Sequence, residues 1–343
     1  LIALQAAVVI VAMLRFSGSF VYLYWIFLGL SVLAVLVIVS RQTDPGYKIA
    51  WIILILIFPI LGWLFYVFCG GNRLSGRVRR KMQGMDRKLT EVLDQDCKAE
   101  LLAGFGQDAV NQSRYLERYA HCPAYTNTYT KYFPLGDDVF PRMLEELRRA
   151  RRYIFIEYFI IEHGIFWDSI VEILKEKHAA GVDVRVIYDD VGCIYKLPMS
   201  YAKRFEAETG IPCCVFNRFR PILSIRMNNR DHRKLLIVDG HTAFTGGVNL
   251  ADEYINVKER FGHWKDSAIL VQGEAAWSMT VMFLTMWGYI REVEEDYDRL
   301  RPDGQPPEAS LGKGYYVQPY ADNPLDNEPV GETVYLNLVS KAK

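Results

Sequence analysis

The sequence predicts amino-terminal transmembrane helices followed by an α/β domain whose central sheet is mostly parallel. Two uncharged apolar runs, residues 20–39 and 49–69, each have about the length needed to cross ~30 Å of hydrocarbon as a helix. Between residues 129 and 292, strand-like apolar runs alternate with amphipathic helical stretches, which is typical of a parallel sheet covered by helices. The chain has 343 residues, of which 51% are hydrophobic, so it can bury a large core and form more than one domain.

Residues 1–70 are interpreted as two or three membrane segments. The second apolar run carries aromatic side chains toward its ends, where amphipathic rings prefer the interface, and Pro59 with Gly62 predicts a kink in it. Residues 1–14 are apolar but short, and their topology stays open. A cleaved signal peptide is the alternative for a single apolar run, but consecutive runs joined by the charged hairpin 41–48 argue against cleavage.

A basic stretch follows the apolar runs. Residues 71–120 are polar and helix-prone, and we expect them to form a juxtamembrane connector. Asp86 alone opposes a cluster of seven basic residues: Arg73, Arg77, Arg79, Arg80, Lys81, Arg87 and Lys88. By the positive-inside rule, this cluster places everything downstream in the cytoplasm. Contact with anionic lipid headgroups is the other interpretation of the same cluster.

The α/β domain is expected over residues 121–300. Its predicted strands are residues 129–133, 153–161, 182–188, 211–216, 234–238, 242–245 and 267–271. Its predicted helices begin after residue 137 and cover about 166–180, 200–209 and 274–292. The Pro- and Gly-rich stretch 301–313 is a linker signal, and residue 315 onward would begin a second, incomplete unit. Residues 333–343 read as the opening of a helix with no stop signal, so we expect the natural protein to continue.

Charge and cysteine content narrow the possible functions. Forty basic and 40 acidic residues give a net charge of zero, so there is no global electrostatic argument for nucleic acid or acidic membranes. The six cysteines show no C-x-x-C spacing and no neighbouring histidine ligand set, so zinc and a disulfide framework are both poorly supported. A reducing compartment fits this cysteine usage best.

The main candidate site is the stretch from His232 to Asn249. In the extended conformation that residues 235–238 favour, side chains alternate between faces, so His232 and Lys234 share one face and can meet one phosphate. Asp239 has the opposite parity and ends the strand. It is therefore expected to hold the turn or a neighbouring cation and not to touch substrate.

Other charged residues have two interpretations each. Glu157 lies in an apolar strand, so it either faces a site or pairs with an interior cation such as Arg185. Asp189 and Asp190 end a strand, where ligand crevices are common, but helix capping explains such a position more often. Six basic residues, opposed by Asp231, suit an anionic substrate of either lipid or nucleic-acid origin: Arg218, Arg220, Arg226, Arg230, Arg233 and Lys234.

The spacing H-x-K-x4-D-x6-G-G-x-N, from His232 to Asn249, resembles the first repeat of the phospholipase D superfamily motif. The two or three apolar runs, the strand at Glu157 and the segments 181–185 and 264–266 extend the resemblance, over nearly the whole chain, to bacterial cardiolipin synthases.

The chain departs from that family in one respect, because the family carries two such motifs in one polypeptide. The sequence His263-Trp264-Lys265 repeats the H-x-K spacing, but Leu270 stands where an acid is required, so it is not a second copy. The resemblance therefore places the second motif beyond Lys343, in a second phospholipase D-like domain.

The resemblance implies a phosphatidyltransferase that makes cardiolipin and glycerol from two phosphatidylglycerol molecules through a phosphohistidine. His232, Lys234 and Asp239 would be its catalytic motif residues, with His232 as nucleophile or as general acid and base. Four residues would hold the phosphate without a metal or cofactor: Lys234, Gly246, Gly247 and Asn249. Asp266 would fix the histidine tautomer, and Glu157 is the second candidate for that role.

The same resemblance implies a multi-pass protein of the bacterial cell membrane with a cytoplasmic catalytic domain. Its partners would be phosphatidylglycerol and anionic lipids and not nucleic acid, while the acceptor lipid and the oligomeric state stay open. A membrane-tethered phosphodiesterase or nuclease that works as a dimer is the alternative function, and a catalytically dead lipid-binding scaffold is a third. The 343 residues alone are expected to be inactive, because half of the site is missing.

Overall fold

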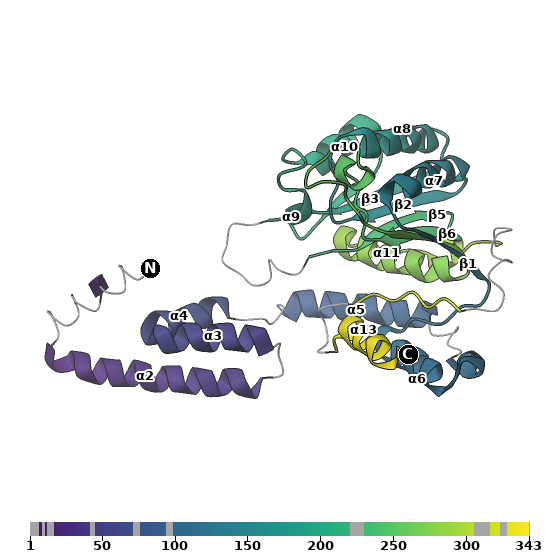
Figure 1. Cartoon of the computed structure of the whole chain (residues 1–343). Coiled ribbons are helices and arrows are strands. Elements are labelled where there is room, and N and C mark those ends of the chain that lie inside the picture. The colour runs from purple at the N-terminus through teal and green to yellow at the C-terminus, as the bar shows by residue number, and fades with distance from the viewer. Residues whose placement is uncertain are drawn as a thin grey trace. The chain divides into compact units, whose positions relative to one another are not determined.

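The structure is a computed structural model, and it describes residues 7–8, 11, 17–41, 45–70, 76–93, 99–219, 230–304, 316–322 and 328–342. The chain divides into two compact units (Figure 1). The smaller unit comprises residues 1–75 and 220–228, and the larger unit comprises residues 76–219 and 229–343.

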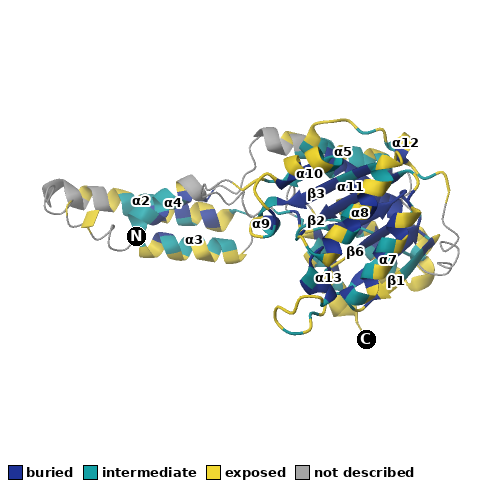
Figure 2. Ribbon diagram, turned by 90° about the horizontal axis from the view of Figure 1, so that it is seen from above, coloured by how far each residue is buried: buried dark blue, intermediate teal, exposed yellow. Residues whose placement is uncertain are grey.

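The larger unit is built on a seven-stranded sheet with the order β1-β7-β6-β5-β2-β3-β4. The strands are β1 (Thr128–Phe133), β2 (Tyr153–Tyr158), β3 (Asp183–Asp189), β4 (Cys213–Phe216), β5 (Lys234–Val238), β6 (Thr242–Gly246) and β7 (Ala268–Gly273). Each lies at or within a few residues of a predicted strand. Most strand residues are buried, as Figure 2 shows.

The prediction of a mostly parallel sheet is wrong, because the sheet is mixed. β2, β3 and β4 pair in parallel, whereas β1, β7, β6, β5 and β2 pair antiparallel in succession. The physical reason is the tight turn between β5 and β6, where Asp239 and Gly240 adopt positive φ angles of 53° and 73°. A turn this short can join only antiparallel strands.

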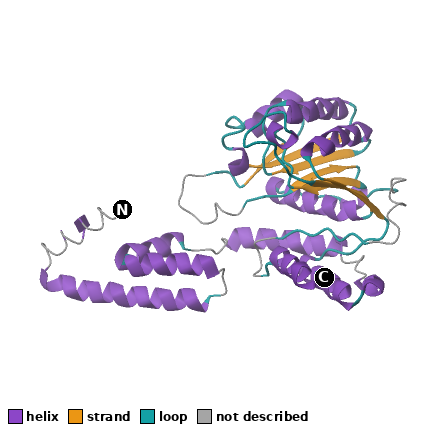
Figure 3. Cartoon of the chain, viewed as in Figure 1, coloured by secondary structure: helices purple, strands orange, loops and turns teal. Residues whose placement is uncertain are grey.

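Helices cover both faces of the sheet (Figures 1 and 3). α7 (Gly136–Arg149), α8 (Ile165–Ala179) and α10 (Tyr201–Thr209) lie on one face, and α11 (Ala275–Arg291) lies on the other. Most of α11 is buried, since α5 (Gly76–Leu93) packs on the side of α11 away from the sheet. Its sequence is apolar on all sides, as expected of a helix held between two layers. Short helical turns complete the unit: α9 (Asp190–Cys193), η4 (Asp252–Ile255) and α12 (Tyr297–Leu300).

Residues 71–120, predicted to be a connector, instead contribute packed helices to the larger unit. After α5 come η2 (Ala99–Phe105) and α6 (Gln107–Ala120), and Leu93 at the end of α5 is fully buried. The segment expected to open a second unit is packed here as well. Its helix α13 (Val330–Lys341) lies against α6 through Val330 and Val334, which contact Leu116. The predicted linker 301–313 lies largely outside the described residues.

The smaller unit contains α2 (Ser17–Ser40), α3 (Pro45–Ile57) and α4 (Pro59–Cys69). The run 20–39 is helical as predicted, but the run 49–69 is divided between two helices and is not one kinked helix. The break falls at Phe58, because Pro59 disfavours helical geometry in the residue before it and suits the first turn of a new helix. Among the described helices, none combines the length and apolarity needed to cross a membrane.

α3 and α4 form a hairpin that packs against α2. A Cβ atom at Gly62 would collide with the backbone of α3 at Leu54 and Ile55, so the two arms approach closely. At the open end of the hairpin, the hydroxyl of Tyr47 donates to the carbonyl of Gly70 at 2.8 Å. At its tip, the hydroxyl of Ser31 in α2 donates to the carbonyl of Pro59 at 2.8 Å, which gives this buried hydroxyl a partner in an apolar environment.

Candidate active site

The carboxyl ends of β2 and β3 meet the amino end of β5 at one edge of the sheet. β5 runs antiparallel to β2, so Tyr158, the last residue of β2, pairs with Lys234, the first residue of β5. His232 lies two residues before β5, and Phe159 is the first residue after β2. This region, which we call the His232 edge, collects most of the residues that the motif contains.

His232 and Lys234 are in direct contact. Nζ of Lys234 lies 3.1 Å from Nδ1 of His232 and donates to the carbonyl oxygen of His232 at 2.7 Å. The ring of Phe159 lies 4.7 Å from the ring of His232, and Nζ of Lys234 lies 5.4 Å from the centre of the Phe159 ring. Lys234 is only 3% exposed, whereas His232 is exposed. A ligand that arrives from solvent therefore meets the imidazole first, with the cation fixed behind it.

Burial lowers the pKa values of both Lys234 and His232. It lowers the pKa of Lys234 to about 8, against the raising influence of Asp231 and Asp266. Burial and then the charge of Lys234 lower the pKa of His232, so the imidazole is largely neutral at pH 7, the form that can attack phosphorus. When Lys234 is an ammonium, it can only donate, so Nδ1 accepts in this contact and the imidazole proton is assigned to Nε2.

A buried ion-pair group holds the segment that carries His232. Arg233 lies between Glu157 and Asp231, at N–O distances of 2.7 Å and 3.2 Å. Desolvation raises the pKa of the Glu157 carboxyl, while the charge of Arg233 opposes that shift. Glu157 therefore positions the backbone beside His232 from the interior and does not itself face solvent.

This arrangement corrects the expected partner of Glu157. The partner is Arg233 and not Arg185, which instead pairs with Asp183 at 2.7 Å and with Glu295 at 2.8 Å. The sequence could not distinguish these cations, because Arg185 also lies beside Glu157's strand. Position along the strands decides the pairing: Arg185 lies on the same face of the sheet as Glu157, but in the parallel register it is level with Phe155, two residues before Glu157.

Asp189, at the end of β3, acts as an anchor. Its carboxylate accepts from the backbone N–H groups of Val191 and Gly192 at 2.8 Å and 3.1 Å, which confirms the helix-capping interpretation. The same carboxylate accepts from the N–H of Asp231 at 3.0 Å and from Nη1 of Arg230 at 3.3 Å. The cap of α9 and the segment before β5 are thus tied to one buried carboxylate.

The predicted arginine cluster is not a free anion site in the described part of the chain. Arg230 donates to the carbonyl of Asn217 as well as to Asp189, and Arg233 is paired with buried acids. Arg220 and Arg226 lie outside the described residues. Of the four basic residues in this set that the structure describes, Lys234 is the one placed against His232.

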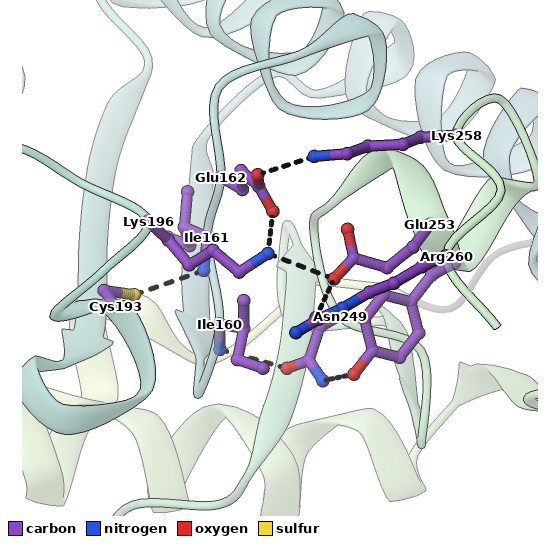
Figure 4. A network of polar contacts seen from close by, with 10 residues as sticks. Ile160, Ile161, Glu162, Cys193, Lys196, Asn249, Glu253, Lys258 and Arg260 are labelled. Carbon is purple, nitrogen blue, oxygen red and sulfur yellow. Dashed lines mark hydrogen bonds and ion pairs between the residues drawn. The ribbon is translucent and has the colours of Figure 1, made fainter.

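Asn249 uses both ends of its amide inside the protein. Its Oδ1 accepts from the N–H of Ile160 at 3.0 Å, and its Nδ2 donates to the hydroxyl of Tyr254 at 2.8 Å (Figure 4). Asn249 therefore fixes the chain that leaves β2 next to His232. Nδ2 keeps one further hydrogen, which is the group left for a phosphate oxygen, so the expected phosphate contact stays a prediction.

The two glycines of the motif serve close packing. A Cβ atom at Gly246 would collide with the backbone of Ser267 and Ala268, and one at Gly247 would collide with the carboxylate of Asp266. The N–H of Gly247 donates to the carbonyl of Ser267 at 2.9 Å, so it is already engaged. The close packing of Gly247 lets Asp266 come near Lys234, and the expectation that both glycines line the phosphate stays a prediction. A role of Asp266 in setting the His232 tautomer stays a prediction.

Asp239 lies at the other end of β5 from Lys234. Its carboxylate accepts from three consecutive backbone N–H groups, those of Arg151, Arg152 and Tyr153, at 2.9, 2.7 and 2.9 Å. Its φ angle of 53° places it in the left-handed region, which Asp tolerates better than most residues. Asp239 thus holds the turn and the start of β2, and the expectation that it does not touch phosphorus stays a prediction.

Comparisons with known proteins match the part of the chain that carries these residues. Residues 143–287, which include His232, Lys234 and Asn249, match the family described as "Cardiolipin synthase, PLD-like domain". Residues 29–71 match the family described as "Phospholipase_D-nuclease N-terminal". The chain belongs to the phospholipase D superfamily.

Several relatives of this phospholipase D-type chain are known. An uncharacterized protein of Streptococcus mutans is 40% identical over 90% of this chain and 66% of its own length. The cardiolipin synthase of Geobacillus kaustophilus is 30% identical over 95% of this chain and 65% of its own length, and cardiolipin synthase 2 of Bacillus anthracis is 32% identical over 74% and 49%. The chain thus spans less than two thirds of the length of these cardiolipin synthases. NucT from Helicobacter pylori covers 50% of this chain at 14% identity, with a TM-score of 0.35, too low to support an inference.

Sequence reasoning missed three residues of the phospholipase D site. Phe159 forms the surface on which His232 and Lys234 lie. Asp231 contacts both Asp189 and Arg233, and Tyr254 orients Asn249. Asp231 had a signal, because it is the acid within the basic stretch before β5. Within the described ranges, no group of three or more His, Cys, Asp or Glu side chains could hold a metal ion.

Proposed function

We propose that this phospholipase D-type domain supplies half of the active site of a membrane phosphatidyltransferase, which joins two phosphatidylglycerol molecules into cardiolipin and releases glycerol. The observation that carries the proposal is the exposed imidazole of His232 with Nζ of Lys234 3.1 Å away, inside the matched family domain. A neutral imidazole backed by a buried cation suits attack on an anionic phosphodiester.

The proposed reaction has two displacements. A lone pair of His232 attacks the phosphorus of the first phosphatidylglycerol, a phosphorus–nitrogen bond forms, and the bond to the terminal glycerol oxygen breaks. That oxygen takes a proton from the histidine of a second motif. The hydroxyl of the second phosphatidylglycerol then returns a proton to the second histidine while its oxygen attacks phosphorus, and the bond to His232 breaks. The two histidines exchange roles if the other one is the nucleophile.

The second histidine must come from outside the His232 motif. The H-x-K-x4-D pattern with Gly-Gly-x-Asn occurs once in these 343 residues. The cardiolipin synthases that the chain matches are longer than the chain. We infer that a further part of the protein completes the site, so that the 343 residues by themselves have little activity.

The smaller unit supports a membrane location for the enzyme. Its helices expose large apolar side chains around their circumference: Tyr22, Trp25, Ile26, Leu33, Leu36, Ile53 and Leu56. Such a surface is costly in water and suits lipid. We infer that this unit lies in the bacterial cell membrane and that the basic residues after it keep the catalytic unit on the cytoplasmic side. Membrane attachment brings the enzyme to two lipid substrates and limits competition by water.

The test uses membranes that contain the full-length protein and labelled phosphatidylglycerol, without nucleotide. We expect equal amounts of cardiolipin and free glycerol, and His232→Ala should lower the rate by at least about a thousandfold. The matched control is His263→Ala, which removes an exposed histidine of the H-x-K sequence that lacks the acid. An unchanged rate for His232→Ala, or an equal loss for His263→Ala, would refute the assignment.

A dimeric phosphodiesterase or nuclease is the second candidate, since one motif per chain could be completed by a second copy. The internal pairing of Arg230 and Arg233 leaves less free positive charge for nucleic acid, which favours the lipid substrate. Assaying the purified protein on DNA and on phosphatidylglycerol vesicles separates the two. Cleavage of DNA without lipid transfer would select the nuclease.

A further inference from the structure

Two loops beside the His232 edge expose large apolar side chains to an unusual degree. Residues 194–199 follow α9, and residues 256–261 follow η4; we call these two segments the rim loops. Their exposed apolar residues, with exposed fractions, are Tyr195 at 96%, Met199 at 93%, Phe261 at 76% and Val257 at 51%. Fully exposed large apolar side chains clustered on loops mark an interaction surface more often than a structural need.

A network of ion pairs joins the two rim loops (Figure 4). Lys196 of the first loop contacts Glu162 and also Glu253, the latter at 3.2 Å. From the second loop, Lys258 reaches Glu162 at 3.3 Å and Arg260 reaches Glu253 at 3.1 Å. Two carboxylates are thus shared by three cations, and the loops that carry Tyr195, Met199, Val257 and Phe261 are held side by side.

The same network is tied to the His232 edge. The N–H of Glu162 donates to the carbonyl of Leu250 at 3.0 Å, and the N–H of Ile161 donates to Sγ of Cys193 at 3.2 Å. Glu162 is also only three residues after Phe159, whose ring contacts His232. Through Glu162, both rim loops are thus linked to the segment that leaves β2 beside His232 and that Asn249 also holds, at Ile160.

The charges of the rim loops are arranged with the acids inside and the cations outside. The side chains of Glu253 and Glu162 are 2% and 18% exposed, whereas those of Lys258 and Arg260 are 58% and 46% exposed. Glu259 is an exposed acid in the same loop, and the adjacent Lys265 is exposed as well. The outward charge of this segment is therefore positive, although the whole chain has a net charge of zero.

We propose that the rim loops are a membrane-docking surface that inserts into the anionic face of a lipid bilayer, so that a lipid headgroup passes from the bilayer to His232 without crossing water. The proposed function supplies the reason for the domain to dock on a bilayer, and this proposal rests on it to that extent. The lipid contacts of the rim loops do not depend on the reaction itself. Tyr195, Met199 and Phe261 enter the headgroup and upper acyl region. Lys258 and Arg260 meet lipid phosphates.

The chemistry of the surface selects a bilayer over another occupant. Aromatic side chains with flanking cations are the combination that favours the interface between water and hydrocarbon. Each cation near an anionic surface adds to the attraction, and the apolar side chains add the free energy of leaving water. A substrate lipid that stays partly in its leaflet also avoids the cost of extracting two acyl chains into water.

The first test maps contacts directly in the full-length protein reconstituted into phosphatidylglycerol-containing bilayers. A phosphatidylglycerol with a diazirine near the start of one acyl chain is activated by light, and the cross-linked peptides are identified by mass spectrometry. We expect cross-links on both rim loops and none at Tyr132, an equally apolar exposed residue of β1. Labelling of Tyr132 to the same extent as the rim loops, or no labelling of the rim loops, would overturn the proposal.

The second test compares variants. The triple variant Tyr195→Ser, Met199→Ser, Phe261→Ser should lower the transfer rate on bilayer phosphatidylglycerol by at least about tenfold, because each lost insertion removes apolar contact with lipid. Its rate on dispersed short-chain phosphatidylglycerol should be unchanged, as should its thermal unfolding. The control Tyr132→Ser should change neither rate. An equal loss on both substrates would show that the loops act in the chemistry and would reject docking.

His232→Ala separates this proposal from the proposed function. It should abolish transfer and leave the rim-loop cross-links intact. Cross-links without any transfer in the unsubstituted protein would reject the proposed function alone, whereas transfer without cross-links would reject the docking surface alone.

Discussion

His232 and Lys234 set the pH range in which the proposed chemistry can run. The pKa of His232 is lowered, so its free-base form should persist below the usual range for histidine and sustain the rate on the acid side. Lys234 has a pKa of about 8, so its ammonium, which is needed to hold phosphate, is lost as the pH rises through that value. We expect kcat/KM of the full-length enzyme to fall above pH ~8.

Lys234→Arg is the matching variant for this pH profile. A guanidinium stays charged at every pH at which the protein is folded, so the fall on the basic side should move to higher pH even if the maximal rate drops. The measurement is kcat/KM against pH for both proteins under identical lipid conditions. A fall that stays at the same pH in Lys234→Arg would assign it to another group.

Asp239 illustrates a motif residue whose effect should fall on stability. Asp239→Ala removes the acceptor of three backbone N–H groups at the start of β2 and should lower the free energy of unfolding by about 2–4 kcal/mol. Asp239→Asn is the control, because it keeps one acceptor oxygen and tolerates the positive φ angle, so its loss should be smaller. Denaturant unfolding measures both, and an equal loss in the two variants would contradict this account.

At the scale of elements, the α3–α4 hairpin depends on the close approach at Gly62. Gly62→Val should separate the two arms, since its Cβ would collide with the backbone of Leu54 and Ile55. The control is Gly29→Val in α2, where a Cβ would meet nothing within 4 Å. In the reconstituted protein, Gly62→Val should lower the free energy of unfolding, whereas Gly29→Val should hardly change it. A similar response of both variants would show that the hairpin arms are not packed as described.

The elements also show what the sequence could and could not specify. Alternation of side chains along β5 was enough to place His232 and Lys234 together, because strand parity is a local property. Strand direction is not a local property. The Asp239-Gly240 turn did indicate that the strands on either side of it are antiparallel, but the prediction of the sheet did not use it. Pro59 allowed either a kinked helix or a new one, and the non-helical geometry of Phe58 in the structure shows that a new helix begins at Pro59.

At the scale of the whole molecule, the sequence could not name the partners of the site residues when those partners lie far along the chain. Glu157 and Asp189 bond to residues far along the chain, at Arg233 and Asp231. Composition showed that each carboxylate needed a partner but not which one, since several arginines were available. The spacing of the motif therefore identified the superfamily, while the buried ion pairs that hold its histidine became visible only in the fold.

The larger unit should require α5 for its stability, although the sequence made α5 look like a connector. Leu93 is fully buried, and Leu89 and Val92 pack in the same cluster against α11. A chain that begins at Gly76 should therefore unfold cooperatively as a monomer, whereas one that begins at Ala99 should expose α11 and aggregate.

A single substitution tests the same idea without a truncation. Leu93→Ala should lower the free energy of unfolding by about 2–5 kcal/mol, and the control Leu101→Ala, at a residue that is 48% exposed, should have little effect. Size-exclusion chromatography and denaturant unfolding provide the measurements. If the chain that begins at Ala99 proved monomeric and as stable as the longer one, the boundary of the catalytic unit would have to be moved to the start of η2.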